Sequence, residues 1–322
     1  MPSLGVLEST LPVVESARHV QVDRERLTEL CRDWLAHPLE IPGWDAEIHW
    51  SDGGPAALNY VLLLDALNFC FWSSGDAPRW GVYVGNTYYD GYKALAAALK
   101  RAVESGIPVT SADYLANLTS QQLDSILSGT APVPMLEYRL ANAREVGQVL
   151  LDKFQGQFSQ AVEQAGGSAP SLAEILAQNF SSFRDEASYG GRPVRLLKRA
   201  QITVVDVYGT FGGQGYGRFD DIAELTAFAD YKIPQVLRAQ GILIYSSELA
   251  AKVDSKTELP AGSPEEIEIR AAMIWAVEWL RQGLKALGRP IQAYELDWLL
   301  WNIGQRPVAH ERPYHRTRTI FY

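Results

Sequence analysis

Three acidic side chains lie in unusually apolar stretches of this sequence of 322 residues. Asp230 stands in ELTAFADYKIPQ (224–235), Asp297 stands in ELDWLLWNI (295–303), and Glu268 shares a predicted helix face with apolar residues. A carboxylate that is held away from water can face a positive charge developing on a substrate. The alternative is that each acid ends a helix, forms an internal ion pair or is a structural acid whose oxygens are satisfied by hydrogen bonds. Both interpretations stay open here, and Asp230 is the candidate catalytic residue.

Basic side chains that could hold a phosphate occur at two places. Lys198 opens KRAQI (198–202), and Arg316 and Arg318 lie in the tail HRTRTIFY (315–322). Such cations bind phosphate oxygens through charge-assisted hydrogen bonds. The alternative is a solvated basic surface. Because the tail ends in the apolar residues IFY, we expect it to dock on the protein.

The overall charge narrows the classes of partner. The net charge is −9 and the sequence pI is near 5.2. Stable contact with a nucleic-acid backbone needs many Lys and Arg on one face, so that class is disfavoured. A small phosphorylated ligand needs only two or three cations and stays possible.

Several other classes lack their sequence signals. Cys31 and Cys70 have no CxxC neighbour and no HExxH or HxH pattern occurs, so neither a metal site nor a disulfide framework is expected. The Gly-rich stretch GTFGGQGYG (209–217) has no GK[ST], and no GxSxG nucleophile motif occurs. No signal peptide and no apolar run of ~18 residues is present, so we expect a cytoplasmic protein without a membrane partner.

Helical signals dominate the elements that must position these side chains. Residues 24–36 (RERLTELCRDWLA) present one apolar face at helical spacing. Three capping residues, each followed three positions later by Glu or Gln, predict helix starts at Thr119, Ser171 and Ser263.

Strand signals are few. WGVYVG (80–85) and TYYDGY (87–92) predict a β-hairpin around Gly-Asn, whereas AQITVVDVY (200–208) is β-branched but surrounded by helix, so its type stays open. We therefore expect a mainly α protein, with residues 1–322 forming one domain and a small β insertion near 80–92.

Six blocks, spread over nearly the whole chain, carry a family resemblance. They are ALNFCFW (66–72), DGYKALAAALKRAVESGIPVTSADYL (90–115), KRAQI (198–202), ELTAFADYKIPQVL (224–237), EIEIRAAMIWAVEWL (266–280) and LDWLLW (296–301). Together with the tail HRTRTIFY, they resemble the queuosine salvage family. Lys232 stands where the family pattern has Arg, so the charge is kept but the bidentate geometry is lost.

The resemblance implies a hydrolase that cleaves the N-glycosidic bond of queuosine 5′-monophosphate, a small nucleotide. The products would be queuine, a 7-deazaguanine base, and ribose 5-phosphate. The resemblance also implies a helical fold similar to the helix-hairpin-helix DNA glycosylases, whose catalytic acid is likewise a single Asp. It implies no metal and no other cofactor.

The sequence offers a candidate for each part of such a reaction. Asp230 would stabilise or attack the oxocarbenium-like ribose, or activate a water. The candidate substrate-binding residues are Phe71 and Trp72 for stacking on the base, Asn68 and Asp297 for its cyclopentenediol, Lys198, Tyr231, Lys232, Arg316 and Arg318 for the 5′-phosphate, and Glu268 as a further acid.

Three other hypotheses stay open from the sequence. The first is a non-catalytic binding protein for 7-deazapurine nucleotides, which would use the same aromatic and basic side chains. The second is a DNA or RNA base glycosylase, for which a basic face and a higher pI would be expected. In the third, all the acids named above form internal ion pairs.

Overall fold

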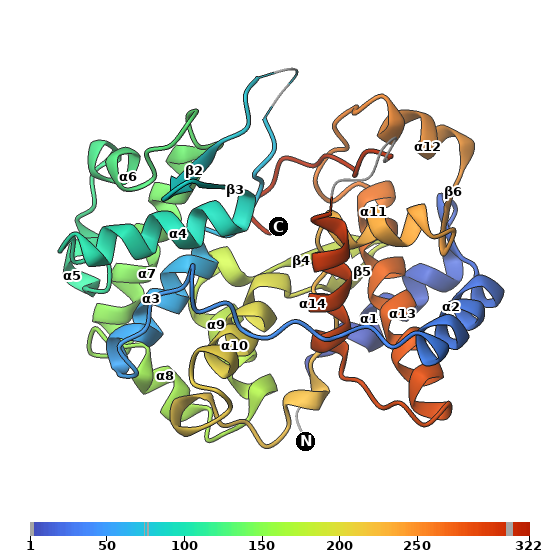
Figure 1. Ribbon diagram of the computed structural model, residues 1–322, viewed down its shortest axis with the longest axis horizontal. Coiled ribbons are helices and arrows are strands. Elements are labelled where there is room, and N and C mark those ends of the chain that lie inside the picture. The colour runs from blue at the N-terminus through green and yellow to red at the C-terminus, as the bar shows by residue number, and fades with distance from the viewer. Residues whose placement is uncertain (1–2, 74, 76, 307–311) are drawn as a thin grey trace.

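The computed structural model describes residues 3–73, 75, 77–306 and 312–322. Within them the chain forms mostly helices (Figure 1). The α-helices are α1 (Val6–Ser16), α2 (Arg24–Ala36), α3 (Pro55–Ala66), α4 (Gly91–Glu104), α5 (Ala112–Ala116), α6 (Ser120–Ile126), α7 (Leu136–Lys153), α8 (Ser159–Gln164), α9 (Ala169–Asn179), α10 (Lys198–Thr210), α11 (Lys232–Ala239), α12 (Ser247–Asp254), α13 (Pro264–Ala286) and α14 (Ala293–Gly304).

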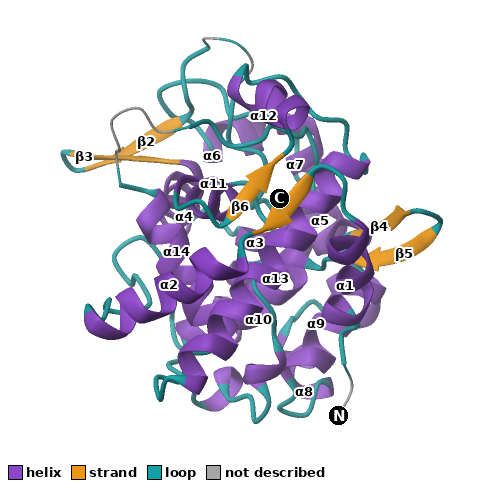
Figure 2. Ribbon diagram, turned by 90° about the vertical axis from the view of Figure 1, so that its right-hand side faces the viewer, coloured by secondary structure: helices purple, strands orange, loops and turns teal. Residues whose placement is uncertain are grey.

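Within the described ranges, six short strands form three two-stranded antiparallel sheets on the outside of the helical body (Figure 2). The strands are β1 (Val20–Val22), β2 (Gly81–Val84), β3 (Thr87–Asp90), β4 (Glu186–Tyr189), β5 (Arg192–Arg195) and β6 (Leu243–Tyr245). The pairs are β1–β6, β2–β3 and β4–β5. The prediction of a mainly α protein with a hairpin near 80–92 is confirmed. The prediction that residues 1–322 form one domain stays a prediction.

The predicted helix starts are confirmed at two of three positions. Thr119 and Gln122 form a reciprocal capping box at α6, and Ser263 accepts a hydrogen bond from a backbone N–H in the first turn of α13. The start at Ser171 is wrong. Helix α9 begins earlier, because Ser168 caps it and Pro170 fits the first helical turn, where its missing N–H has no cost.

Helix α10 lies at the centre of the fold. It also shows that residues 200–208, whose secondary structure the sequence left open, are helical. It spans Lys198–Thr210 and therefore contains all of 200–208. Helix α10 packs against α3 and α9, and α13 packs against α1, α2 and α14. In Figure 1, helices α3 to α8 lie on one side of the molecule and α1, α2 and α11 to α14 on the other. No helix in the described part of the chain is long and apolar enough to cross a membrane.

The carboxyl end of α3 is held by buried polar side chains from two other helices. Arg139 donates to the carbonyl of Leu67, and Arg199 donates to that of Asp65 at 3.0 Å. Asn142 donates to the carbonyl of Ala66 at 2.9 Å. These groups satisfy carbonyls that a helix end leaves without partners. They fix the start of the loop that carries Asn68.

Candidate active site

Arg270 of α13 connects the two segments that carry Lys198 and Asp230. Its guanidinium is buried and makes a bidentate ion pair with Asp185, with N–O distances of 2.5 and 3.0 Å. Arg270 Nε donates to the carbonyl of Ala229 at 3.0 Å. Asp185 Oδ2 in turn accepts the backbone N–H of Lys198 at 3.1 Å. One rigid cation therefore sets the start of α10 relative to the residue before Asp230.

Asp230 caps α11 and keeps one carboxylate oxygen for the cavity. Its Oδ1 accepts the backbone N–H groups of Lys232 at 3.0 Å and Ile233 at 2.9 Å. The residue is only 7% exposed. Burial raises the pKa of Asp230, and Lys198 and the two N–H donors oppose that rise. The N–H groups of a helix start favour the ionised form of such a cap.

Lys198 brings a buried ammonium group to the same place. It is the first residue of α10 and is 6% exposed. Burial lowers the pKa of Lys198, while the negative charges of Asp230, Asp65 and Asp297 oppose that effect. Among the described residues its Nζ has no hydrogen-bond partner, so it can bind an anionic or polar group of a ligand.

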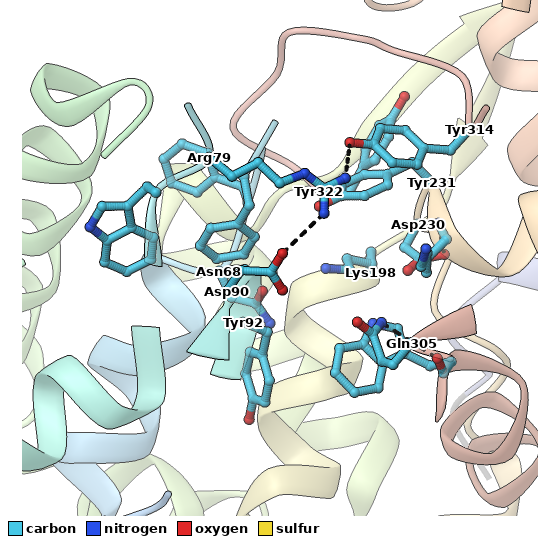
Figure 3. Close-up of a pocket in the computed structure, with 16 residues that line it drawn as sticks. Asn68, Arg79, Asp90, Tyr92, Lys198, Asp230, Tyr231, Gln305, Tyr314 and Tyr322 are labelled. Carbon is cyan, nitrogen blue, oxygen red and sulfur yellow. Dashed lines mark hydrogen bonds and ion pairs between the residues drawn. The ribbon is translucent and has the colours of Figure 1, made fainter. Parts of the chain in front are cut away.

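A cavity with two compartments opens around Lys198 and Asp230. Both compartments share these two residues together with Asn68, Tyr92 and Trp301. The larger compartment has a volume of about 450 Å³ and the smaller about 90 Å³. In Figure 3, Lys198 lies between Asn68 and Tyr92 on one side and Asp230 on the other.

The larger compartment, called here the ring-walled compartment, is lined by Trp44, Trp298, Trp301 and Phe228 together with several acids. Asp297 is 5% exposed, and its Oδ2 accepts the backbone N–H of Phe228 at 2.8 Å. Burial, followed by the charge of Asp230, raises the pKa of Asp297 well above its usual range. The compartment can therefore stack a flat ligand and hydrogen-bond its polar edges.

The smaller compartment, called here the cationic compartment, includes Arg79 and Lys232 besides Lys198. Arg79 Nη1 lies 3.0 Å from Asp90 Oδ2, and its Nη2 donates to Tyr314 Oη at 3.4 Å (Figure 3). The Arg79 side chain is 59% exposed and that of Asp90 is 36% exposed. Such an exposed ion pair contributes little, so Arg79 can turn towards an anion at little cost.

Seven of the predicted site residues line this cavity: Asn68, Phe71, Lys198, Asp230, Tyr231, Lys232 and Asp297. Phe71 lies in the cationic compartment, where its ring stacks on Trp80 with a centroid distance of 6.2 Å. Tyr231 packs on Tyr314 in the same compartment, with centroids 4.8 Å apart. Asp297 lies only in the ring-walled compartment.

Glu268 lies outside both compartments. Its Oε2 accepts the backbone N–H groups of Arg18, His19 and Val20, and Tyr189 Oη donates to its Oε1 at 2.7 Å. Both oxygens of this carboxylate thus accept hydrogen bonds, one from the backbone around the start of β1 and the other from Tyr189. Glu268 orders this part of the chain, and its position corresponds to the structural alternative considered for the acids.

Trp72, Arg316 and Arg318 form a separate packing unit. The Arg318 guanidinium lies 4.7 Å from the Trp72 ring centroid, and that of Arg316 lies 5.4 Å from it. Arg318 also lies 3.2 Å from Glu258. Trp72 lines neither compartment, because the docked tail covers its ring. Arg316 borders an outer hollow that continues from the cationic compartment along Arg79.

Several cavity residues were not predicted from the sequence. Asp206 lines the ring-walled compartment, and a helical interpretation of 200–208 would have found it. Lys198, Ile202 and Asp206 are four residues apart, share one helix face, and all line that compartment. Tyr92, Trp301 and Arg79 had no signal beyond their residue types. In the described part of the chain, no group of three or more His, Cys, Asp or Glu could hold a metal ion.

Comparison with known proteins matches residues 48–322 to the queuosine salvage protein family. The chain belongs to that family. A queuosine 5′-phosphate N-glycosylase/hydrolase from Sphaerobacter thermophilus is 51% identical over 319 residues, which cover 99% of this chain and 98% of the relative. The resemblance predicted from the six blocks is thereby confirmed.

Two eukaryotic members of the queuosine salvage family carry the same name. The protein from Mus musculus is 39% identical over 336 residues, which cover 100% of this chain and 99% of the relative. The protein from Schizosaccharomyces pombe is 33% identical over 319 residues, which cover 90% of this chain and 91% of the relative. Similarity over nearly the full length therefore extends from a bacterium to mammals and fungi.

Proposed function

We propose that this protein hydrolyses the N-glycosidic bond of queuosine 5′-monophosphate and releases queuine for salvage. The observation that carries the proposal is the junction of the two compartments, where Asp230 and Lys198 lie together. A nucleotide has a flat base and a charged phosphate with the sugar between them. The compartments provide the same order of environments, and the relatives are named for this reaction.

Asp230 is the catalytic residue in this proposal. Cleavage of an N-glycoside builds positive charge on C1′ and O4′ of the ribose. The free oxygen of the Asp230 carboxylate lies at the junction, where the ribose would be bound, and its other oxygen is fixed by two N–H groups. A charge that is already oriented stabilises the transition state without reorganisation, and burial strengthens the effect.

The base would occupy the ring-walled compartment. Its volume of about 450 Å³ lies within the range of roughly 300–1,000 Å³ that is usual for ligand pockets. Trp298 and Trp44 provide faces for stacking. Asn68 and Asp297 provide polar groups for the cyclopentenediol.

The 5′-phosphate would occupy the cationic compartment. Its volume of about 90 Å³ suits a substituent rather than a second base. Lys198, Lys232 and Arg79 would bind the phosphate oxygens there. Arg79 would exchange its exposed pairing with Asp90 for the ligand. Arg316 and Arg318 contact Trp72 instead, so we assign them no direct contact with the phosphate.

The likeness to helix-hairpin-helix DNA glycosylases is part of the proposal. It is supported by the mainly helical fold and by the single candidate acid at a helix start. The net charge of −9 favours a free nucleotide over a nucleic acid as substrate. The cytoplasmic location and the absence of a stable nucleic-acid partner stay predictions from the sequence.

A product assay tests the proposed function. The purified protein is incubated with queuosine 5′-monophosphate and, in parallel, with queuosine, and the products are separated by chromatography. We expect queuine and ribose 5-phosphate from the nucleotide. Binding of the nucleotide without base release would instead support the non-catalytic alternative. Release of a base from oligonucleotides, with strong salt dependence, would support the nucleic-acid glycosylase.

A further inference from the structure

Asp206 lines the ring-walled compartment at the end of a chain of three hydrogen bonds. His49 Nδ1 lies 2.6 Å from the backbone carbonyl oxygen of Asp45. His49 Nε2 lies 2.8 Å from Tyr92 Oη, and Tyr92 Oη lies 2.9 Å from Asp206 Oδ2. The proposed function assigns no role to this series of hydrogen bonds.

For a neutral His49 ring, only one assignment of donors and acceptors keeps all three hydrogen bonds of this chain. A backbone carbonyl only accepts, so His49 Nδ1 must carry a proton and donate it. In a neutral imidazole, Nε2 then accepts, and Tyr92 must donate its only hydroxyl proton to it. The bond between Tyr92 and Asp206 is left without a proton from tyrosine. With His49 neutral, Asp206 Oδ2 carries the proton of the third bond and donates it to Tyr92 Oη, whereas an ionised Asp206 would accept from Tyr92.

The surroundings favour both of these protonation states. Burial lowers the pKa of His49 to about 4, so its ring is neutral at pH 7. Burial, followed by the charge of Asp65, raises the pKa of Asp206 well above its usual range, although Tyr92 and Lys198 oppose this. Asp65 is fully buried, and neither of its carboxylate oxygens has a hydrogen-bond partner in the described part of the chain.

The remaining ionisable groups around the ring-walled compartment are Asp45, Lys93, Asp230 and Asp297. Asp206 is 4% exposed, and its Oδ1 has no hydrogen-bond partner among the described residues. Unlike the two Asp65 oxygens, this Oδ1 is not fully buried. Asp206 Oδ1 is therefore open to the compartment. In an uncharged carboxyl group, this oxygen is a hydrogen-bond acceptor.

We propose that Asp206 is a substrate-recognition residue that works as an uncharged carboxylic acid and accepts a hydrogen bond from an N–H group of the base. Tyr92 and His49 are positioning residues, because they hold the acid proton on the oxygen that faces away from the ligand. The lactam edge of a 7-deazaguanine supplies suitable N–H donors. This inference rests on the proposed function, which places the base in this compartment.

The uncharged state also serves the neighbouring catalytic group. A second carboxylate in the same compartment would disfavour ionisation of Asp230, because like charges raise each other's pKa. A neutral Asp206 recognises the base without this penalty. It leaves Asp230 free to carry negative charge next to the ribose.

Two substitutions of nearly equal size test the inference. Asn in Asp206→Asn can donate to Tyr92 through its amide and accept from the base through its carbonyl. Leu in Asp206→Leu can do neither. The dissociation constant of queuine is measured by tryptophan fluorescence, and thermal unfolding checks that both variants fold. We expect Asp206→Asn to bind queuine about tenfold more tightly than Asp206→Leu, or better, since a hydrogen bond is lost only in the second.

Equal dissociation constants for the two variants would overturn the inference, whether binding is tight or weak. An infrared difference spectrum between the wild type and Asp206→Asn gives an independent test at neutral pH. We expect the spectrum to show loss of the carbonyl band of a protonated carboxyl group. Loss of carboxylate bands instead would overturn the inference even if the Leu variant does not fold.

The outcomes also separate this inference from the proposed function. Asp230→Asn should bind queuine but not release it from the nucleotide. If the wild type neither binds queuine nor releases it, the proposed function fails and the inference fails with it. If the wild type releases queuine but the two Asp206 variants bind it equally, only the inference fails.

Discussion

Replacement of Asp230 by Asn separates the catalytic role of this side chain from its structural role. Asp230 Oδ1 accepts two backbone N–H groups at the start of α11, whereas the other oxygen has no protein partner among the described residues. Asn keeps an oxygen for the two N–H groups and places an uncharged amide in the cavity. The substitution thus removes the negative charge and leaves the helix cap in place.

The expected magnitude follows from what is removed. Loss of one oriented electrostatic contact in an active site costs about 3–4 kcal/mol of transition-state stabilisation, which lowers kcat roughly 10²- to 10³-fold. The stability of Asp230→Asn should change little because the cap is kept. Asp230→Ala also loses the acceptor for two buried N–H groups, which should cost a further ~1 kcal/mol of unfolding free energy.

The assay combines two measurements on the wild type and both variants. Release of queuine from queuosine 5′-monophosphate gives kcat and KM, and urea unfolding gives the free energy of unfolding. We expect both variants to lose turnover, with KM nearly unchanged, and only Asp230→Ala to lose stability. Turnover by Asp230→Asn within tenfold of the wild type would show that the charge at position 230 is not needed, and the assigned role would be wrong.

Three further predictions test other parts of the structure. Arg79→Met should raise KM for the nucleotide roughly tenfold or more, since hydrogen bonds to charged groups contribute ~1.5–3 kcal/mol; Arg318→Met is the matched control outside the cavity, and equal KM values for both would contradict the assigned phosphate site. Gly147→Ala should lower the unfolding free energy by at least ~1–3 kcal/mol, because its Cβ would lie 2.2 Å from the backbone nitrogen of Ala116; Gly43→Ala, where nothing lies within 4 Å, should not. Burial holds the pKa of His49 at about 4, below the ~6.5 of an unfolded histidine. The unfolded chain therefore takes up this proton first, and up to about 3 kcal/mol of unfolding free energy should be lost as the pH falls from 6.5 to 4. Urea unfolding of the wild type and of His49→Gln over this pH range should show a smaller loss in the variant.

The features that the sequence predicted well are local ones. The capping box at Thr119 and the cap at Ser263 depend on groups within four residues, so their residue types suffice to predict them. The hairpin around Gly85 follows from the positive φ that its turn needs. The error at Ser171 was also local, since Ser168 and Pro170 offered a better helix start three residues earlier.

The candidate site was predictable only in part. Asp230 and Lys198 could be singled out by their residue types, their apolar surroundings and the family resemblance, and both line the cavity. Trp72 and Glu268 satisfied the same criteria, yet Trp72 packs against the tail and Glu268 holds the segment before β1. Residue type and neighbours in sequence do not determine which buried polar or aromatic group faces a cavity.

The sequence by itself therefore determined the mainly helical class, the caps at Thr119 and Ser263, the hairpin and the family, because these depend on neighbouring residues and on motifs that stay in order along the chain. Only the tertiary structure decided how the cavity is built. Arg270 connects Asp185 to Ala229, and Tyr92 connects His49 to Asp206 across more than a hundred residues. Such contacts arise from the packing of whole helices, and no local pattern records which side chains this packing brings together.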